Sequence, residues 1–171
     1  MRYFVSVSLL ICLCLVSSAG AATLPLGVRG AHNIVLQVEP GPLSVTIQKQ
    51  DLNIYEGPDA LSGRFLDHMG RVIQTFEIPD DDAADMRGEI QSITLETTCS
   101  TSGVYRLEMS GGSDLVIGME TSAQRYAVER GIAFHRAEKS GRVYFQPPEE
   151  TITITASAAH GPGKQDMPLF D

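Results

Sequence analysis

Apolar and polar residues alternate with a period of two along most of this chain, which is the pattern of half-buried β-strands. The clearest example is Leu43-Ser-Val-Thr-Ile47, in which apolar residues alternate with hydroxyl residues. Comparable short apolar or alternating runs, separated by turns at Gly, Pro and Asp, predict extended segments at 32–38, 43–47, 52–55, 61–66, 71–78, 93–95, 104–109, 115–119, 132–134, 143–145 and 151–156.

One segment departs from this pattern. Residues 121–129 are rich in Ala, Gln, Arg and Glu, so a helix is expected there. The helix should be short, because Gly131 ends it. Many short strands without a long amphipathic helix predict an all-β fold, an antiparallel β-sandwich of the jelly-roll or immunoglobulin-like kind. Within it, Tyr105 shares the strand phase of Leu107 and Met109 and is expected in the core.

The chain also contains an internal echo. Gly57-Pro58 is followed by two bulky apolar residues and Asp67, and Gly161-Pro162 is followed at the same spacing by a similar pair and Asp171. We expect a β-sandwich domain over 22–120. Residues 121–171 are either additional strands that complete the sandwich or a truncated second repeat.

The first 21 residues are typical of a secretory signal peptide. Met1-Arg2 gives a positive start, an apolar run of about 14 residues follows, and Ala19-Gly-Ala21 supplies the small residues of a cleavage site. The apolar run is short for a bilayer span, although an uncleaved anchor is the alternative. We therefore expect a secreted or periplasmic protein with no membrane span after signal cleavage.

The net charge argues against one class of partner, and the cysteine content predicts a single buried thiol. The net charge is −8, and it becomes one unit more negative when Arg2 is removed with the signal. An acidic protein repels phosphate backbones, so no nucleic-acid partner is expected. Cys12 and Cys14 also leave with the signal, so Cys99 remains alone, and we expect it buried near the end of a strand.

Three further segments of the chain resemble a known family. These are Leu43-Ser-Val-Thr-Ile47, Phe65-Leu-Asp-His-Met-Gly70 and Ser102-Gly-Val-Tyr-Arg-Leu107. Together they resemble the pre-peptidase C-terminal domain family, β-sandwich modules attached to secreted bacterial hydrolases. The resemblance covers 34–109, and the usual Asp-x-Asp-x-Tyr opening is missing. It implies an accessory role, such as matrix or polysaccharide binding or assistance in secretion, rather than catalysis.

The best candidate site in the sequence is an acidic loop between two predicted strands. Its carboxylates, within ten residues, are Asp80, Asp81, Asp82, Asp85 and Glu89. Calcium prefers six to eight hard oxygen ligands, and a cation would relieve the repulsion between these charges. The spacing does not match an EF-hand, so the alternative is a solvated loop that aids solubility.

No catalytic motif stands out. The four histidines are scattered, and Ser110-Gly-Gly-Ser-Asp114 looks like a turn rather than a nucleophile elbow. Sugar rings stack on aromatic faces, and the candidates are Tyr55, Tyr126 and Tyr144.

These features favour an exported, non-catalytic module, not an enzyme, that binds an extracellular polymer or protein. Two alternatives stay open. One is the N-terminal, non-catalytic part of a larger secreted hydrolase. The other is an envelope structural subunit that assembles through an open strand edge.

Overall fold

The computed structural model describes residues 21–83, 86–129 and 133. The chain divides into a unit of residues 1–138 and a unit of residues 139–171, and all described residues lie in the first. They form nine strands: β1 (Ala22–Arg29), β2 (Ile34–Val38), β3 (Gly41–Asp51), β4 (Leu61–Leu66), β5 (Val72–Ile78), β6 (Gln91–Cys99), β7 (Gly103–Gly111), β8 (Leu115–Thr121) and β9 (Arg125–Val128).

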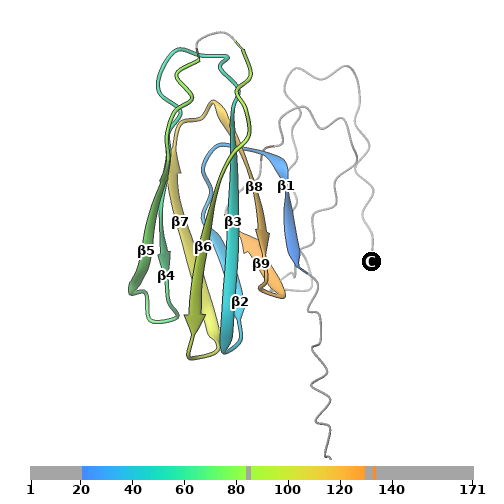
Figure 1. The fold of residues 1–171 in the computed structure, drawn as a ribbon, viewed down its shortest axis with the longest axis vertical. Coiled ribbons are helices and arrows are strands. Elements are labelled where there is room, and N and C mark those ends of the chain that lie inside the picture. Colours follow the sequence, from blue (N-terminus) through green and yellow to red (C-terminus); the bar gives the residue numbers. More distant parts are fainter. Residues whose placement is uncertain (1–20, 84–85, 130–132, 134–171) are drawn as a thin grey trace, which may run out of the picture. The chain divides into compact units, whose positions relative to one another are not determined.

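The strands form two antiparallel sheets that enclose one core (Figure 1). The four-stranded sheet has the order β1-β8-β3-β6, and the five-stranded sheet has the order β5-β4-β7-β2-β9. This arrangement confirms the predicted all-β sandwich. Nothing in the described ranges is a helix long and apolar enough to cross a membrane.

Alternate residues of each strand build the core, as the period of two requires. In β3 the side chains of Leu43, Val45 and Ile47 are buried, while the hydroxyl residues between them reach the outer face. Tyr105 is 3% exposed and its ring centroid lies 5.9 Å from that of Phe65, which confirms the predicted strand phase. Cys99, the last residue of β6, is buried as expected.

The structure corrects the sequence-based elements at three places. Residues 125–128 form β9 and not a helix, because they pair with β2 and add a strand to the five-stranded sheet. Residues 52–55 are not a strand, since the chain turns away at Asn53, whose φ is +52°. Strand β1, which pairs with β8, was not predicted. The expected segments at 143–145 and 151–156, the echo at 161–171 and Tyr144 lie outside the described residues.

Three connections meet at one end of the sandwich, the upper end in Figure 1. They follow β3, β5 and β7 and cover residues 52–60, 79–90 and 112–114. The backbone nitrogens of Ile54 and Tyr55 donate to the Asp114 carboxylate, and that of Asp81 donates to Asp51. Loops that are distant in the sequence are thereby fixed against each other.

Candidate metal site

The inward row of β3 ends in two charged residues. Lys49 and Asp51 continue the phase of Leu43, Val45 and Ile47, and both side chains are fully buried. The Lys49 Nζ lies 2.8 Å from Asp51 Oδ2, and it also donates to the carbonyl of Pro79 at 2.5 Å and to Gln91 Oε1 at 3.0 Å. The ammonium group therefore has three acceptors, and it joins β3 to β6 and to the end of β5.

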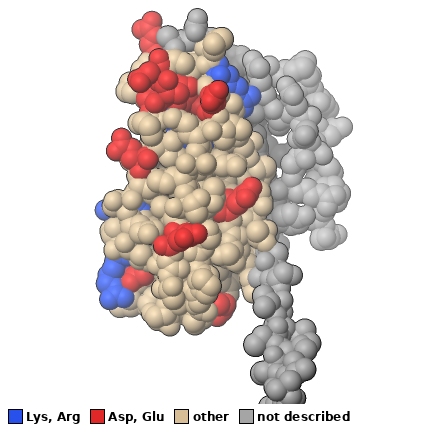
Figure 2. All heavy atoms as spheres, in the orientation of Figure 1, with Lys and Arg blue, Asp and Glu red and all other residues tan. Residues whose placement is uncertain are grey.

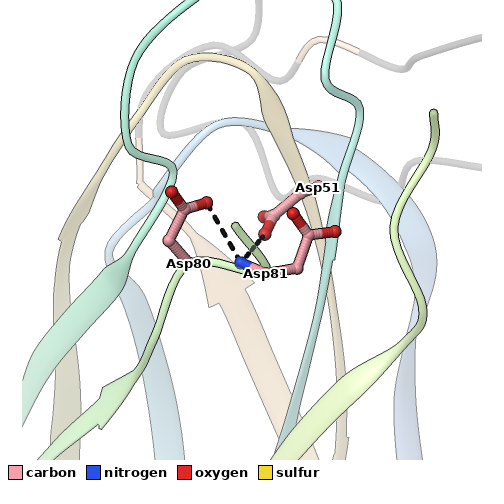
Figure 3. Close-up of side chains that lie close together, drawn as sticks. All are labelled: Asp51, Asp80 and Asp81. Atoms are coloured by element: carbon pink, nitrogen blue, oxygen red, sulfur yellow. Dashed lines mark hydrogen bonds between the residues drawn. The ribbon is translucent and has the colours of Figure 1, made fainter. Parts of the chain in front are cut away.

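Within the described ranges, one of the two Asp51 carboxylate oxygens has hydrogen-bond partners and the other has none. Its Oδ2 accepts from Lys49 and from the backbone nitrogen of Asp81, at 3.2 Å. Its Oδ1 is buried and has no hydrogen-bond partner in the part of the chain that the structure describes. Asp80 and Asp81 lie beside it, and one oxygen from each of the three carboxylates lies within 4.8 Å of the others (Figure 3).

The loop after β5 is shaped to place Asp81. The Asn53 side-chain amide lies 3.3 Å from both Asp81 oxygens and donates to the Met86 carbonyl at 2.6 Å. Gly88 leaves room for the carboxylate, because a Cβ at this position would lie 1.8 Å from Asp81 Oδ2. The backbone of Asp82 has a φ of +57°, in the left-handed region that Asn and Asp tolerate best.

Two further buried carboxylates lie at this end. Asp114, 3% exposed, accepts from the Arg29 guanidinium at 3.2 Å and caps the loop after β3 through two backbone nitrogens. Asp59 is 4% exposed, and its backbone nitrogen donates to Asp80 Oδ1 at 3.3 Å. Gly112 makes space for Asp59, since a Cβ there would lie 2.0 Å from its Oδ1.

Burial makes this negative charge costly. Desolvation raises the pKa of Asp51 above its ordinary value, and the hydrogen bond and positive charge of Lys49 oppose that rise. Desolvation, followed by the negative charge of Asp114, also raises the pKa of Asp59. Acidic side chains are prominent at the same end of the surface (Figure 2). A cation at this end would stabilise the charged forms.

The structure brings together only part of the acidic set that the sequence suggested. Asp80 and Asp81 belong to the described carboxylate group, whereas Asp82 and Glu89 are exposed and outside it. Asp85 lies outside the described residues. The member that sequence reasoning missed is Asp51, which lies between the segments predicted at 43–47 and 52–55. The sequence did contain a signal for Asp51. Lys49 and Asp51 occupy the alternate positions after Ile47, so they continue the row of β3 side chains that face inward.

The remaining histidines, tyrosines and turn residues that the sequence suggested as candidates make contacts elsewhere in the fold. The His32 ring nitrogen is 3.0 Å from the Arg29 carbonyl, and His68 lies beside Tyr105. Of the turn expected at 110–114, Ser110 and Gly111 instead end β7, and residues 112–114 connect β7 to β8. Tyr55 is 64% exposed under the Arg29 guanidinium, and the Tyr126 hydroxyl donates to Thr23. His135 and His160 lie outside the described ranges.

A second surface feature is an open depression of about 700 Å³ on the outer face of β4, β5 and β7. The register places two cross-strand rows of outward side chains along it. The first row is Thr75, Arg64 and Glu108, and the second is Glu77, Ser62 and Ser110. The Arg64 and Glu108 side chains form an ion pair at 2.6 Å.

The fold and these surfaces define an antiparallel β-sandwich with an acidic group of loops at one end and a polar depression on one sheet. No protein-family model matches the chain, and no curated protein matches it.

Proposed function

We propose that this chain is an exported, non-catalytic β-sandwich module that binds a hydroxyl-rich polymer or a protein outside the cytoplasm. The observation that supports the proposal most is the polar depression on β4, β5 and β7. Its six outward side chains offer guanidinium, carboxylate and hydroxyl groups from three neighbouring strands.

Rigid strands hold these groups at regular intervals. Neighbouring strands lie about 4.8 Å apart, and alternate residues on one strand are about 6.8 Å apart, so the two rows form a small grid of donors and acceptors. The depression is open, whereas pockets for small substrates usually enclose most of the ligand. An open, polar and rigid surface suits an extended polymer that contacts several rows in turn.

The proposal is tested by retention of the full chain on insoluble peptidoglycan, chitin, cellulose and collagen. We expect retention on at least one of these supports, and a loss of at least tenfold in affinity for the Arg64→Ala/Glu108→Ala variant. The matched control is Thr46→Ala/Thr94→Ala, which removes a hydroxyl pair at 2.9 Å from the outer face of the other sheet. Retention on none of the supports, or equal losses in the two variants, would show the proposal to be wrong.

Assembly through a strand edge is a second candidate, which one observation favours. Strand β5 is an edge of the five-stranded sheet, and Val72 and Ile73 at its beginning are 49% and 36% exposed. An unpaired edge with apolar side chains can pair with a strand of another chain. Gln74 opposes this role in part, because its amide donates to the Glu96 carbonyl of β6.

Gel filtration over a wide range of protein concentration tests edge pairing. A concentration-dependent dimer that Ile73→Lys abolishes would support it, and a monomer at the highest concentration would exclude it. The hypothesis of a larger secreted hydrolase is tested separately by the intact mass of the exported polypeptide. That mass should exceed the mass of residues 22–171 if the hypothesis is right.

A further inference from the structure

We propose that Asp51, Asp80 and Asp81 bind one calcium ion where β3 and the chain leaving β5 meet. The site is independent of the polar depression on the outer sheet face. It also differs from the acidic loop as the sequence presents it, because a buried strand residue replaces the exposed loop carboxylates.

The buried Oδ1 of Asp51 carries the inference. Buried polar atoms almost always have a hydrogen-bond partner, and those without one require an explanation such as a missing water or ion. Here the side chain is 0% exposed, and Lys49 and the Asp81 nitrogen both bind the other oxygen. Among the described residues no donor reaches Oδ1, and the neighbouring carboxylates of Asp80 and Asp81 donate nothing when ionised.

The spacing fits one coordination sphere. The three ligand oxygens lie within 4.8 Å of each other. Calcium binds oxygen at about 2.3–2.6 Å, so two oxygens on opposite sides of the ion are about 4.6–5.2 Å apart. Magnesium binds at about 2.0–2.1 Å and would draw opposite ligands to within about 4.2 Å. Magnesium also demands a near-ideal octahedron, whereas calcium accepts irregular oxygen geometry, so calcium is the ion that we expect here.

The charges also fit. Asp51, Asp80 and Asp81 contribute three negative charges when ionised, and the Lys49 ammonium neutralises one of them. The two that remain match one divalent cation. The donors are all carboxylate oxygens, which suit a hard ion, whereas zinc sites in proteins usually include histidine or cysteine. Lys49 binds Oδ2 of Asp51, which leaves Oδ1 as the oxygen available to the ion.

Such an ion would connect the two sheets. Asp51 ends β3 of the four-stranded sheet, while Asp80 and Asp81 follow β5 of the five-stranded sheet. The carbonyl of Pro79 already binds Lys49 at this point, so the ion would add a second link beside the buried ammonium. We therefore expect calcium to stabilise the fold as well as to bind.

The test is calorimetric titration of the chelator-treated full chain with calcium chloride, together with thermal unfolding at each concentration. We expect one binding event per chain, a melting temperature that rises with the logarithm of calcium concentration, and weaker binding of magnesium. Asp81→Asn should weaken calcium binding at least tenfold. The matched control is Asp82→Asn, which removes a charge from the neighbouring exposed position and should change the affinity less than threefold.

Asp80→Asn is the second variant, in case Asp81→Asn does not fold. Among the described residues, Asp80 accepts hydrogen bonds from the backbone nitrogens of Asp59 and Asp81 alone, and its variant should also lose at least tenfold in affinity. Absence of both binding heat and a thermal shift at millimolar calcium would overturn the proposal. Equal effects of the Asp82→Asn variant and of the Asp80 or Asp81 variant would overturn it too, since binding would then reflect only the net charge of the loop.

Discussion

The buried pair of Lys49 and Asp51 gives the sharpest prediction for stability. Replacing Lys49 by Met keeps a long side chain but removes the charge and the bonds to Asp51, Pro79 and Gln91. The buried Asp51 carboxylate then loses its counter-charge. Breaking a buried pair from one side typically costs about 3–5 kcal/mol of unfolding free energy, and we expect a loss of that size.

Urea denaturation of the chelator-treated chain measures this loss. With a slope of about 2 kcal/mol per molar urea, a loss of about 3–5 kcal/mol lowers the midpoint by about 1.5–2.5 M. The matched control is Arg64→Met, which breaks an ion pair of similar length with Glu108 on the open sheet face. The Arg64 side chain is 58% exposed, so its loss should cost less than about 1 kcal/mol.

A double variant separates the ion pair from simple packing. In Lys49→Met/Asp51→Leu both charges are gone, so no uncompensated carboxylate is left in the interior. We expect this variant to recover at least half of the stability that Lys49→Met loses, because apolar replacements of buried pairs are often neutral. If Lys49→Met costs no more than Arg64→Met, the explanation based on an uncompensated buried charge is wrong.

Three further predictions follow from particular contacts. Tyr105→Ala should cost about 3–5 kcal/mol in urea denaturation because the ring is core, and a loss below about 1 kcal/mol would contradict the observed burial. Gly112→Ala should cost about 1–3 kcal/mol, because the new Cβ would lie 2.0 Å from Asp59 Oδ1. The variant Gly112→Ala/Asp59→Gly removes this clash, so equal losses of stability in the two variants would refute the explanation. Burial raises the pKa of Asp67, but hydrogen bonds from Arg71 and the Met69 nitrogen outweigh it, so the net pKa is lowered. A lowered pKa contributes stability above the ordinary value of 3.8 that is lost as pH falls through the folded value. The difference in stability between wild type and Asp67→Asn should therefore shrink below about pH 3.8, and a difference that stays constant with pH would contradict the assignment.

The strands were largely predictable because their pattern is a local property. A half-buried strand must place apolar side chains on alternate positions, and Leu43, Val45 and Ile47 show this without any knowledge of their neighbours. The burial of Tyr105 and Cys99 followed in the same way from their strands. The strand at 125–128 was not predictable, because its helical composition was overridden by pairing with β2, which composition cannot show.

The acidic end was only partly predictable. The run of Asp residues after β5 is visible in the sequence, and it suggested a cation site. Hydrophobic patterning ended the strand at Ile47, since Lys49 and Asp51 are charged and were not recognised as inward residues. The hydrogen bond between Asp51 and the Asp81 nitrogen joins residues 30 positions apart, and it exists because β3 and β5 end at the same end of the sandwich.

The sequence by itself determined the fold class, since alternation, turns and the scarcity of helical segments all report local chemistry. It also determined that the chain is acidic, with a concentration of carboxylates in one loop. Only the tertiary structure decided which carboxylates meet. Strand pairing brings Asp51, Asp80 and Asp81 together and leaves Asp82 exposed. Burial leaves Asp51 with one oxygen that has no partner among the residues that the structure describes. The physical reason is that proximity between distant residues depends on how the sheets pair and pack.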